Sequence, residues 1–277
     1  MLLGIDIGGT TISLGLVEGT EIVKLNRVPS FQKDASLQET MDYLIGRIEE
    51  LITPEVTSIG IGVPTLVDVD NGIVYNATNI KSWTEVPIKS ILEERFKIPV
   101  NVNNDANCFV LGAAARLNAA KGPNDVVAGV TLGTGTGLGV MVGGKLFCGA
   151  DCGAGEICSI PYNGQNYESF CSKQFFINRG TTPRDASDAA AAGDSKALAL
   201  FEEFGRHMGE VLSVVLYAYA PVCIVLGGGV SNTFKHFKDS MERTLRERYP
   251  YSRVLDRLQI HVMPSEDTAL LGASLLS

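Results

Sequence analysis

The chain has 277 residues, of which 45% are hydrophobic and 19% are charged, and its formal net charge is −8. This length and composition suit one large domain or two smaller ones with a sizeable core. The acidic balance argues against nucleic acid as the main partner, because phosphate backbones are bound through basic surfaces. It does not exclude a nucleotide, which backbone N–H groups and a metal ion can hold.

No export or membrane signal is predicted. The first residues carry an acid at Asp6 and no basic segment, unlike a secretory signal. The longest apolar stretch, 211–226, contains Pro221 and is shorter than the ~18–20 residues that a membrane span needs. It predicts a buried helix followed by a buried strand, and we expect a cytoplasmic protein. The six cysteines include no C-x-x-C pair, and we interpret them as reduced, buried small residues.

Two parts of the chain open in the same way. Each begins with an apolar strand, continues into a glycine–threonine turn and returns as a second strand. The two predicted hairpins span residues 2–16 and 126–142, and residues 145–147 extend the second one. This internal repetition predicts two related α/β domains that face each other.

Alternating strands and helices fill the rest of the chain and imply α/β layers. Helices are predicted for 36–52, 87–96, 107–120, 195–220 and 268–276, and strands for 58–64, 99–102 and 222–226. Ser36 and Glu39 form a capping box at the first helix, and Pro221 ends the long one. The polar stretch 179–194 is predicted to connect two helices. We place a small N-terminal domain at 1–105 and a larger domain at 106–267.

The two glycine–threonine turns are candidate phosphate loops. Without Cβ atoms, residues 8–11 (Gly-Gly-Thr-Thr) let successive N–H groups point at phosphate oxygens, and Asp6 just before them can hold Mg²⁺. A plain hairpin is the alternative. The second turn, 132–139, lacks the Gly-Lys-Ser/Thr ending of a P-loop and no helix follows it, so it is not a dinucleotide-binding turn either. Two such turns, one in each half, can clamp a triphosphate between domains.

Three further clusters consist of polar residues or of glycines. Residues 103–107 (Asn-Asn-Asp-Ala-Asn) start a helix, so Asn104 or Asp105 is either an N-cap or a base that accepts a hydroxyl proton. The carboxylates of Glu156 and Glu168 either bind sugar hydroxyls or are solvated surface charges. The glycine run that begins at Gly227, after a buried strand, either lies under an adenosine or simply connects a strand to a helix.

Taken together, these motifs resemble the ROK family of sugar kinases and repressors, within the hexokinase–actin–Hsp70 superfamily. The matches occur in order over nearly the whole chain, at 4–10, 60–64, 79–83, 104–107, 132–137, 153–157 and 227–229. The resemblance implies two ribonuclease-H-like (actin-like ATPase) α/β domains with a cleft between them, and a C-terminal helix at about 268–277 that packs on the first domain. It also implies ATP and Mg²⁺ as cofactors, and a homodimer, which is the usual oligomeric state in the family.

The resemblance implies a role for each motif. Asp105 would be the catalytic base and Asp6 would position Mg²⁺. The residues that would hold ATP are Asp6, Gly8, Gly9, Thr10, Thr11, Thr134, Gly135, Thr136, Gly228 and Gly229. The residues that would hold the sugar are Gly62, Asn79, Asn104, Asp105, Glu156, Ser159 and Glu168.

One segment departs from the family pattern. ROK kinases continue from Gly-Glu-Ile into Gly-His and then a cysteine-rich segment that binds structural zinc. Here Ser159 stands where the His is expected, and 164–171 replaces the cysteine-rich segment. Because tetrahedral zinc needs four ligands, we expect no zinc site, although Cys152, Cys158 and Cys171 are an alternative ligand set. The sugar recognised is expected to differ accordingly.

These motifs favour a kinase that transfers phosphate from ATP to a hexose or N-acetylhexosamine. Three alternatives remain: a repressor, a sugar sensor without turnover, and a kinase of a non-sugar acceptor. A repressor of this family carries an N-terminal helix-turn-helix domain, for which the hairpin at residue 2 leaves no room. The altered 159–171 segment motivates the sensor, and the presence of Asp105 opposes it.

Overall fold

The computed structural model describes residues 1–77, 79–119 and 121–276, apart from the side chains at 265 and 266. The chain divides into two compact units. Unit 1 comprises Met1–Ala119, Leu146–Ala154 and Glu266–Ser277, and unit 2 comprises Ala120–Lys145 and Gly155–Ser265. Unit 1 is therefore assembled from three separate stretches of sequence.

Unit 1 contains a mixed sheet with the strand order β3-β2-β1-β4-β8. Strands β1 and β2 form the predicted antiparallel hairpin, whereas β1, β4 and β8 run parallel. Its elements are β1 (Leu2–Ile7), β2 (Thr11–Glu18), β3 (Glu21–Pro29), α1 (Leu37–Glu49), β4 (Ser58–Val63), β5 (Leu66–Asp68), β6 (Ile73–Tyr75), β7 (Glu85–Val86), α2 (Ile88–Phe96), β8 (Val100–Asn104), α3 (Asp105–Leu117), the 3₁₀ turn η1 (Ala150–Cys152) and α10 (Ser265–Ser274).

Helices cover both faces of this sheet. Leu3 and Ile5 of β1 pack in one core cluster with Leu44 of α1. Because side chains alternate along a strand, Gly4 faces the other way, where a Cβ would lie 2.3 Å from the carbonyl oxygen of Leu270 in α10. The predicted capping box is present at the start of α1 and fixes where that helix begins.

Helix α3 belongs to unit 1, although the sequence placed it in the second domain. A Cβ at Gly112 would lie 2.0 Å from the carbonyl oxygen of Thr268, so α3 and α10 touch backbone to backbone. Glycine alone allows so close an approach. Helix α3 also begins at Asp105 rather than at residue 107, because the Asn104 side chain caps it.

Unit 2 contains a second sheet with the strand order β11-β10-β9-β14-β15. Strands β9 and β10 are antiparallel, and β9, β14 and β15 run parallel. Its elements are β9 (Val126–Leu132), β10 (Thr136–Val142), β11 (Lys145–Leu146), the 3₁₀ turn η2 (Glu156–Ser159), β12 (Pro161–Tyr162), β13 (Gln165–Asn166), α4 (Tyr167–Cys171), α5 (Lys173–Ile177), α6 (Pro183–Ala191), α7 (Ser195–Tyr219), β14 (Cys223–Gly227), the 3₁₀ turn η3 (Gly229–Thr233), α8 (Phe234–Arg248), α9 (Ser252–Leu255) and β15 (Gln259–Val262).

The two sheets share a plan: in each, an antiparallel pair (β2–β1 or β10–β9) is followed in the strand order by two parallel pairings. The repetition seen in the sequence is thus a repetition of topology. The stretch 179–194, predicted as a connection, instead contains α6, which Thr182 caps and Pro183 begins. Pro at the first helical position and a threonine cap are ordinary helix-start signals.

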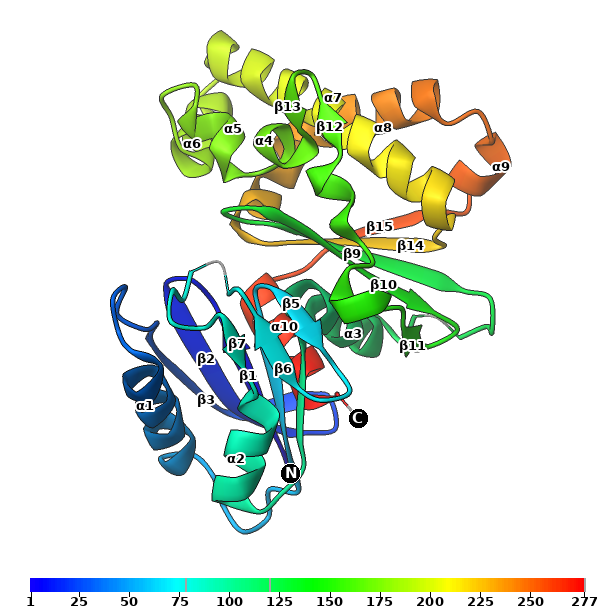
Figure 1. Cartoon of the computed structure of the whole chain (residues 1–277). Helices are drawn as coiled ribbons and strands as arrows, with labels where there is room; N and C mark the ends of the chain where they lie inside the picture. The colour runs from blue at the N-terminus through cyan, green and yellow to red at the C-terminus, as the bar shows by residue number, and fades with distance from the viewer. Residues whose placement is uncertain (78, 120, 277) are drawn as a thin grey trace. The chain divides into compact units, whose positions relative to one another are not determined.

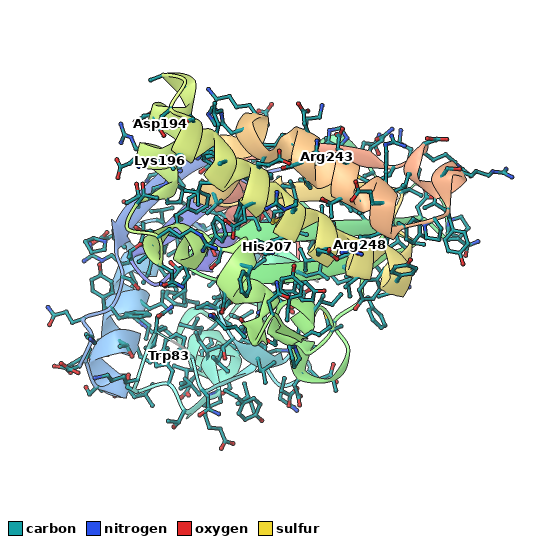
Figure 2. The ribbon with its side chains drawn as sticks, turned by 90° about the horizontal axis from the view of Figure 1, so that it is seen from above. Trp83, Asp194, Lys196, His207, Arg243 and Arg248 are labelled. Carbon is teal, nitrogen blue, oxygen red and sulfur yellow. The ribbon has the colours of Figure 1, made fainter. Side chains whose placement is uncertain are left out.

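Helices α7 and α8 lie side by side over one face of the second sheet (Figure 1). Small residues allow the contact, since a Cβ at Gly209 would lie 2.6 Å from the Cβ of Thr244. Arg243 and Arg248 extend from α8 (Figure 2) and form ion pairs with glutamates of α7. Arg243 pairs with Glu202, and Arg248 pairs with Glu210 at 2.7 Å. Among the described residues, no helix has both the length and the apolar character that crossing a membrane requires.

Candidate functional site

In unit 1 the predicted site residues meet where three parallel strands end. Asp6 of β1 lies opposite Gly62 of β4, and Gly62 lies opposite Asn103 of β8. A Cβ at Gly62 would lie 3.6 Å from the Asp6 carboxylate and 3.2 Å from the Cys108 sulfur. Ligands of open α/β sheets commonly bind at the carboxyl ends of the strands, and this end carries both predicted acids.

Asp105 takes the first position of α3, directly after β8. Its backbone position is fixed by Asn104, whose side chain accepts the Ala106 N–H at 2.9 Å and donates to the Thr65 carbonyl at 3.1 Å. Burial, together with the nearby carboxylates of Asp6 and Asp105, raises the pKa of the Cys108 thiol well above its usual range. The two acids therefore share one neighbourhood, and both are half-buried. Asn104 is therefore the N-cap of α3, and the chemical role of Asp105 stays a prediction.

The first glycine–threonine turn is an ordered hairpin loop. The Gly8 N–H donates to the Thr11 carbonyl at 2.9 Å, and the hydroxyl of Ser30, directly after β3, donates to the Gly8 carbonyl at 2.8 Å. Gly9 and Thr10 are exposed at its tip. The Asn79 side chain lies against Gly9, where a Cβ would meet its amide nitrogen at 2.9 Å. A predicted phosphate contact and a predicted sugar contact are therefore neighbours.

Asn103 is a polar residue to which the sequence assigned no role. It is 6% exposed, and its side-chain oxygen accepts the Asn104 N–H at 2.8 Å and the Asn107 amide at 2.9 Å. It also accepts the Cys152 thiol at 3.1 Å. Buried amides are hydrogen-bonded because an unmet donor or acceptor is costly. The strand β8 reads Val-Asn-Val-Asn-Asn, and no feature of that pattern distinguishes Asn103 from the two half-buried asparagines beside it.

In unit 2 the second glycine–threonine turn is tied to α4. The Glu168 carboxylate accepts the Thr136 N–H at 3.1 Å, and the Thr136 hydroxyl donates to the Cys171 carbonyl at 2.9 Å. A Cβ at Gly135 would lie 2.5 Å from that carboxylate. Thr134 stays exposed at the tip of the turn. Glu168, predicted as a sugar contact, therefore also braces the predicted phosphate loop.

The remaining predicted residues of unit 2 lie close to these. A Cβ at Gly228, whose φ is +87°, would lie 2.2 Å from the carbonyl oxygen of Leu132, so the Gly228–Gly229 turn touches the strand that leads into the phosphate loop. The Ser159 hydroxyl lies 3.4 Å from the Glu156 carboxylate. Burial raises the pKa of Cys158 to about 12, with Glu168 and Glu156 adding to the shift. The two predicted carboxylates are thus near the same thiol.

Comparison with known proteins decides the family. The ROK family model matches residues 2–277. This chain belongs to the ROK family. It is 30% identical to a glucokinase of Thermotoga maritima, over 99% of this chain and 96% of the relative. It is 31% identical to an N-acetyl-D-glucosamine kinase of Vibrio cholerae, over 84% of this chain and 85% of the relative. A xylose repressor of Bacillus spizizenii is 28% identical, over 90% of this chain and 69% of the repressor.

The fold is that of ROK sugar kinases. A ROK glucokinase from Streptomyces griseus, solved with glucose and AMPPNP, superposes with a TM-score of 0.79 at 27% identity, covering 99% of this chain and 98% of that one. The expected actin-like α/β fold class is therefore confirmed.

The cysteines of this ROK chain do not gather as metal ligands. Within the described part of the chain, no three His, Cys, Asp or Glu side chains lie together as a metal site would require. Cys152 contacts Asn103 in unit 1, whereas Cys158 and Cys171 lie in the core of unit 2. In place of the cysteine-rich segment, Tyr162 and Tyr167 stack at 4.3 Å. Aromatic packing thus anchors α4 here.

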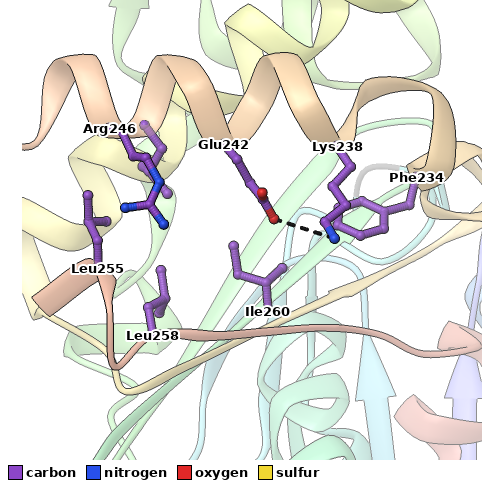
Figure 3. A pocket seen from close by; sticks show the side chains of 8 residues that line it. Phe234, Lys238, Glu242, Arg246, Leu255, Leu258 and Ile260 are labelled. Atoms are coloured by element: carbon purple, nitrogen blue, oxygen red, sulfur yellow. Dashed lines mark ion pairs between the residues drawn. The ribbon is translucent and has the colours of Figure 1, made fainter. Parts of the chain in front are cut away.

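A shallow hollow of about 180 Å³ on α8, α9 and β15 lies apart from all of these ROK motifs (Figure 3). Lys238 and Glu242, one turn apart on α8, pair at 3.8 Å and line it together with Leu258 and Ile260. No predicted site residue lines it. We assign no ligand to it.

Proposed function

We propose that the protein transfers the γ-phosphate of ATP to a hydroxyl of a hexose or N-acetylhexosamine, with Asp105 as the general base. The observation that carries the proposal is the meeting of Asp6, Gly62 and Asp105 at the carboxyl ends of β1, β4 and β8. The relatives' names, glucokinase and N-acetyl-D-glucosamine kinase, support the substrate class.

The chemistry follows from where the proton must go. A sugar hydroxyl that attacks phosphorus in line gains positive charge and must lose its proton, which an adjacent carboxylate accepts late in the transfer. Asp105 suits this role because Asn104 fixes its backbone and Asn103 fixes Asn104. A base held by a helix cap needs no rearrangement before it acts.

The half-buried Asp6 carboxylate, beside the side-chain-free Gly62, fits a hard cation such as Mg²⁺, which prefers oxygen ligands. When bound, Mg²⁺ neutralises the charge of the phosphates. The exposed Gly9 and Thr10 in unit 1 and Thr134 in unit 2 would offer N–H and hydroxyl donors to the phosphate oxygens.

Asn79, Asn104, Glu156 and Glu168 are the proposed sugar contacts, with Ser159 where the family histidine is expected. Ser159 is shorter than histidine, and its hydroxyl lies 3.4 Å from the Glu156 carboxylate. We therefore propose that the hydroxyl pattern recognised here differs from that of the histidine-containing relatives. The cytoplasmic location and the homodimer stay predictions.

The test is Asp105→Asn, with Asp34→Asn as a matched control, because Asp34 is an aspartate of the same unit with an 82% exposed side chain. Asp105→Asn should lower kcat by roughly 100-fold or more, the usual contribution of a general base. Sugar binding, measured by calorimetry, should persist, and Asp34→Asn should leave both unchanged. Turnover of Asp105→Asn within a few-fold of the original would refute the base assignment.

A coupled ADP-release assay over glucose, N-acetylglucosamine, N-acetylmannosamine and allose tests the substrate class. Stimulation by at least one sugar supports the kinase. Sugar binding without any ADP release would favour the sensor, and stimulation by a non-sugar alcohol alone would favour the third alternative.

A further inference from the structure

A tight loop in unit 1 brings two cysteines onto the buried Asn103. The loop turns sharply, since Asp151 and Cys152 both have left-handed backbones with φ of 48° and 61°. Two backbone bonds close it, from the Gly153 N–H to the Ala150 carbonyl at 2.7 Å and from the Ala154 N–H to the Cys148 carbonyl at 2.9 Å. Non-glycine residues hold such backbones only where surrounding contacts enforce them.

Both sulfurs contact the same amide. The Cys152 thiol donates to the Asn103 oxygen at 3.1 Å, and the Asn103 nitrogen donates to the Cys148 sulfur at 3.5 Å. The Asn107 amide donates to the Cys148 sulfur as well, at 3.7 Å. Both sulfurs therefore lie within hydrogen-bond distance of the one Asn103 side chain. Two sulfurs and two amides thus form one cluster directly before Asn104 and Asp105.

The two thiols differ in ionisation and access. The adjacent Cys152 side chain and then the Asn103 amide lower the pKa of Cys148 to about 6, even though partial burial opposes the shift. The hydrogen bond to Cys148 and burial raise the pKa of Cys152. Cys148 is half-buried and Cys152 is buried. An accessible thiolate beside a protonated thiol is the arrangement of a peroxide-reactive cysteine with its resolving partner.

The other four cysteines lack these properties. In unit 1, Cys108 is buried and its pKa is raised well above the usual range. Cys158 and Cys171 are both buried, and burial raises the pKa of each. Cys223 is buried in β14 with a pKa raised to about 11. Thiols of this kind react slowly because the thiolate is the nucleophile. Reactivity is therefore concentrated at Cys148.

We propose that Cys148 and Cys152 form an oxidation site for hydroperoxides, which closes into a disulfide and switches off the adjacent catalytic run. The Cys148 thiolate attacks the terminal oxygen of the hydroperoxide, so an S–O bond forms, the O–O bond breaks and an alkoxide leaves and takes up a proton. Cys152 then loses its proton and attacks the Cys148 sulfur. An S–S bond forms, the S–O bond breaks, and hydroxide leaves as water with that proton. Two electrons pass from the two thiols to the hydroperoxide.

The effect on turnover rests on the proposed kinase function. Disulfide formation removes the thiol donor from the Asn103 oxygen and draws Cys148 away from two amide donors. Asn103 holds the Asn104 N–H at 2.8 Å, so a change in its hydrogen bonding displaces the residue that caps α3 beside Asp105. Small misplacements of a catalytic group can cost roughly 100-fold in rate. We expect the oxidised form to lose at least tenfold in kcat/KM, on the order of that misplacement effect.

The chemical readout is independent of kinase activity. A protease that cleaves after acidic residues cuts between Asp151 and Cys152, and again after Glu156. After hydrogen peroxide treatment and alkylation of free thiols, peptides 126–151 and 152–156 should travel as one mass that separates on reduction. Recovery of both peptides alkylated, or of Cys148 oxidised without a link to Cys152, would overturn the proposal.

Variants separate this site from general oxidation. Wild-type activity should fall with peroxide and return with dithiothreitol. Cys148→Ser, whose hydroxyl can still accept from the Asn103 and Asn107 amides, should keep its basal activity and resist peroxide, and Cys223→Ala should stay as sensitive as the wild type. Equal sensitivity of Cys148→Ser and wild type would overturn the switch. If the reduced wild type phosphorylates nothing, the proposed function fails, and the linked peptides still decide the oxidation site.

Discussion

The contact between helices α3 and α10 predicts opposite effects for the same substitution at two glycines. A Cβ at Gly272 would lie 1.7 Å from the carbonyl oxygen of Cys108, which is backbone and cannot swing aside. A Cβ at Gly46, inside α1, would meet nothing within 4 Å. Both glycines lie within helices, so helix propensity favours alanine at each by about 1 kcal/mol.

The clash decides the sign at Gly272. The two helices must separate by well over an ångström to reach ordinary contact, and overpacking of this kind costs about 3 kcal/mol or more. After the helix-propensity gain of about 1 kcal/mol, about 2 kcal/mol or more of destabilisation remains. Gly272→Ala should therefore lower Tm by about 4 °C or more, and Gly46→Ala should raise it by about 2 °C, at the ~2–4 °C per kcal/mol typical of proteins of this size. Thermal unfolding followed by circular dichroism measures both. Equal stability of the two variants would refute the close approach of α3 and α10.

The remaining predictions concern unit 2. Glu168→Gln should keep an acceptor for the Thr136 N–H, so Tm should not change. It should raise the KM for the sugar roughly tenfold, because a hydrogen bond to a charged group contributes about 1.5–3 kcal/mol. An unchanged KM would show that Glu168 does not bind the sugar. Burial lowers the pKa of His207 although Glu203 opposes the shift. The unfolded chain therefore binds the proton more readily, and stability should fall as the pH drops below the ordinary value of 6.5. In urea titrations His207→Gln should lose less stability than the wild type over that interval; identical pH dependence would contradict this.

Local patterns in the sequence predicted much of the fold. The two hairpins, the Ser36 capping box and the end of the long helix at Pro221 all depend on residues near each other in the chain. Helix α6 was missed because Ala- and Gly-rich polar composition also suits a loop. Helix α3 was assigned to the wrong side of the boundary because its partner α10 lies far along the sequence, at a glycine contact that no local pattern marks.

The candidate site divides in the same way. The sequence predicted the motifs that carry Asp6 and Asp105 because each combines the end of a strand with a turn or the start of a helix. It did not predict the contact between Asn103 and Cys148. That contact joins 103–107 to 148–152, which lie far apart in the sequence and meet only in the folded chain. The bond from Thr136 to Glu168 likewise joins a loop to a helix that spacing alone does not bring together.

The discontinuity of unit 1 has a consequence for its biogenesis. Its first stretch ends at Ala119, but α10, which Gly4, Gly60 and Gly112 contact, is supplied from Glu266 onward. At the ~5–20 residues per second at which chains are synthesised, the nascent β1–β4–β8 sheet waits for its covering helix for roughly 10–30 s while unit 2 is completed. During that interval one face of the sheet lacks its permanent cover. A chaperone that binds apolar β-sheet surface therefore has a defined period in which to act on this protein.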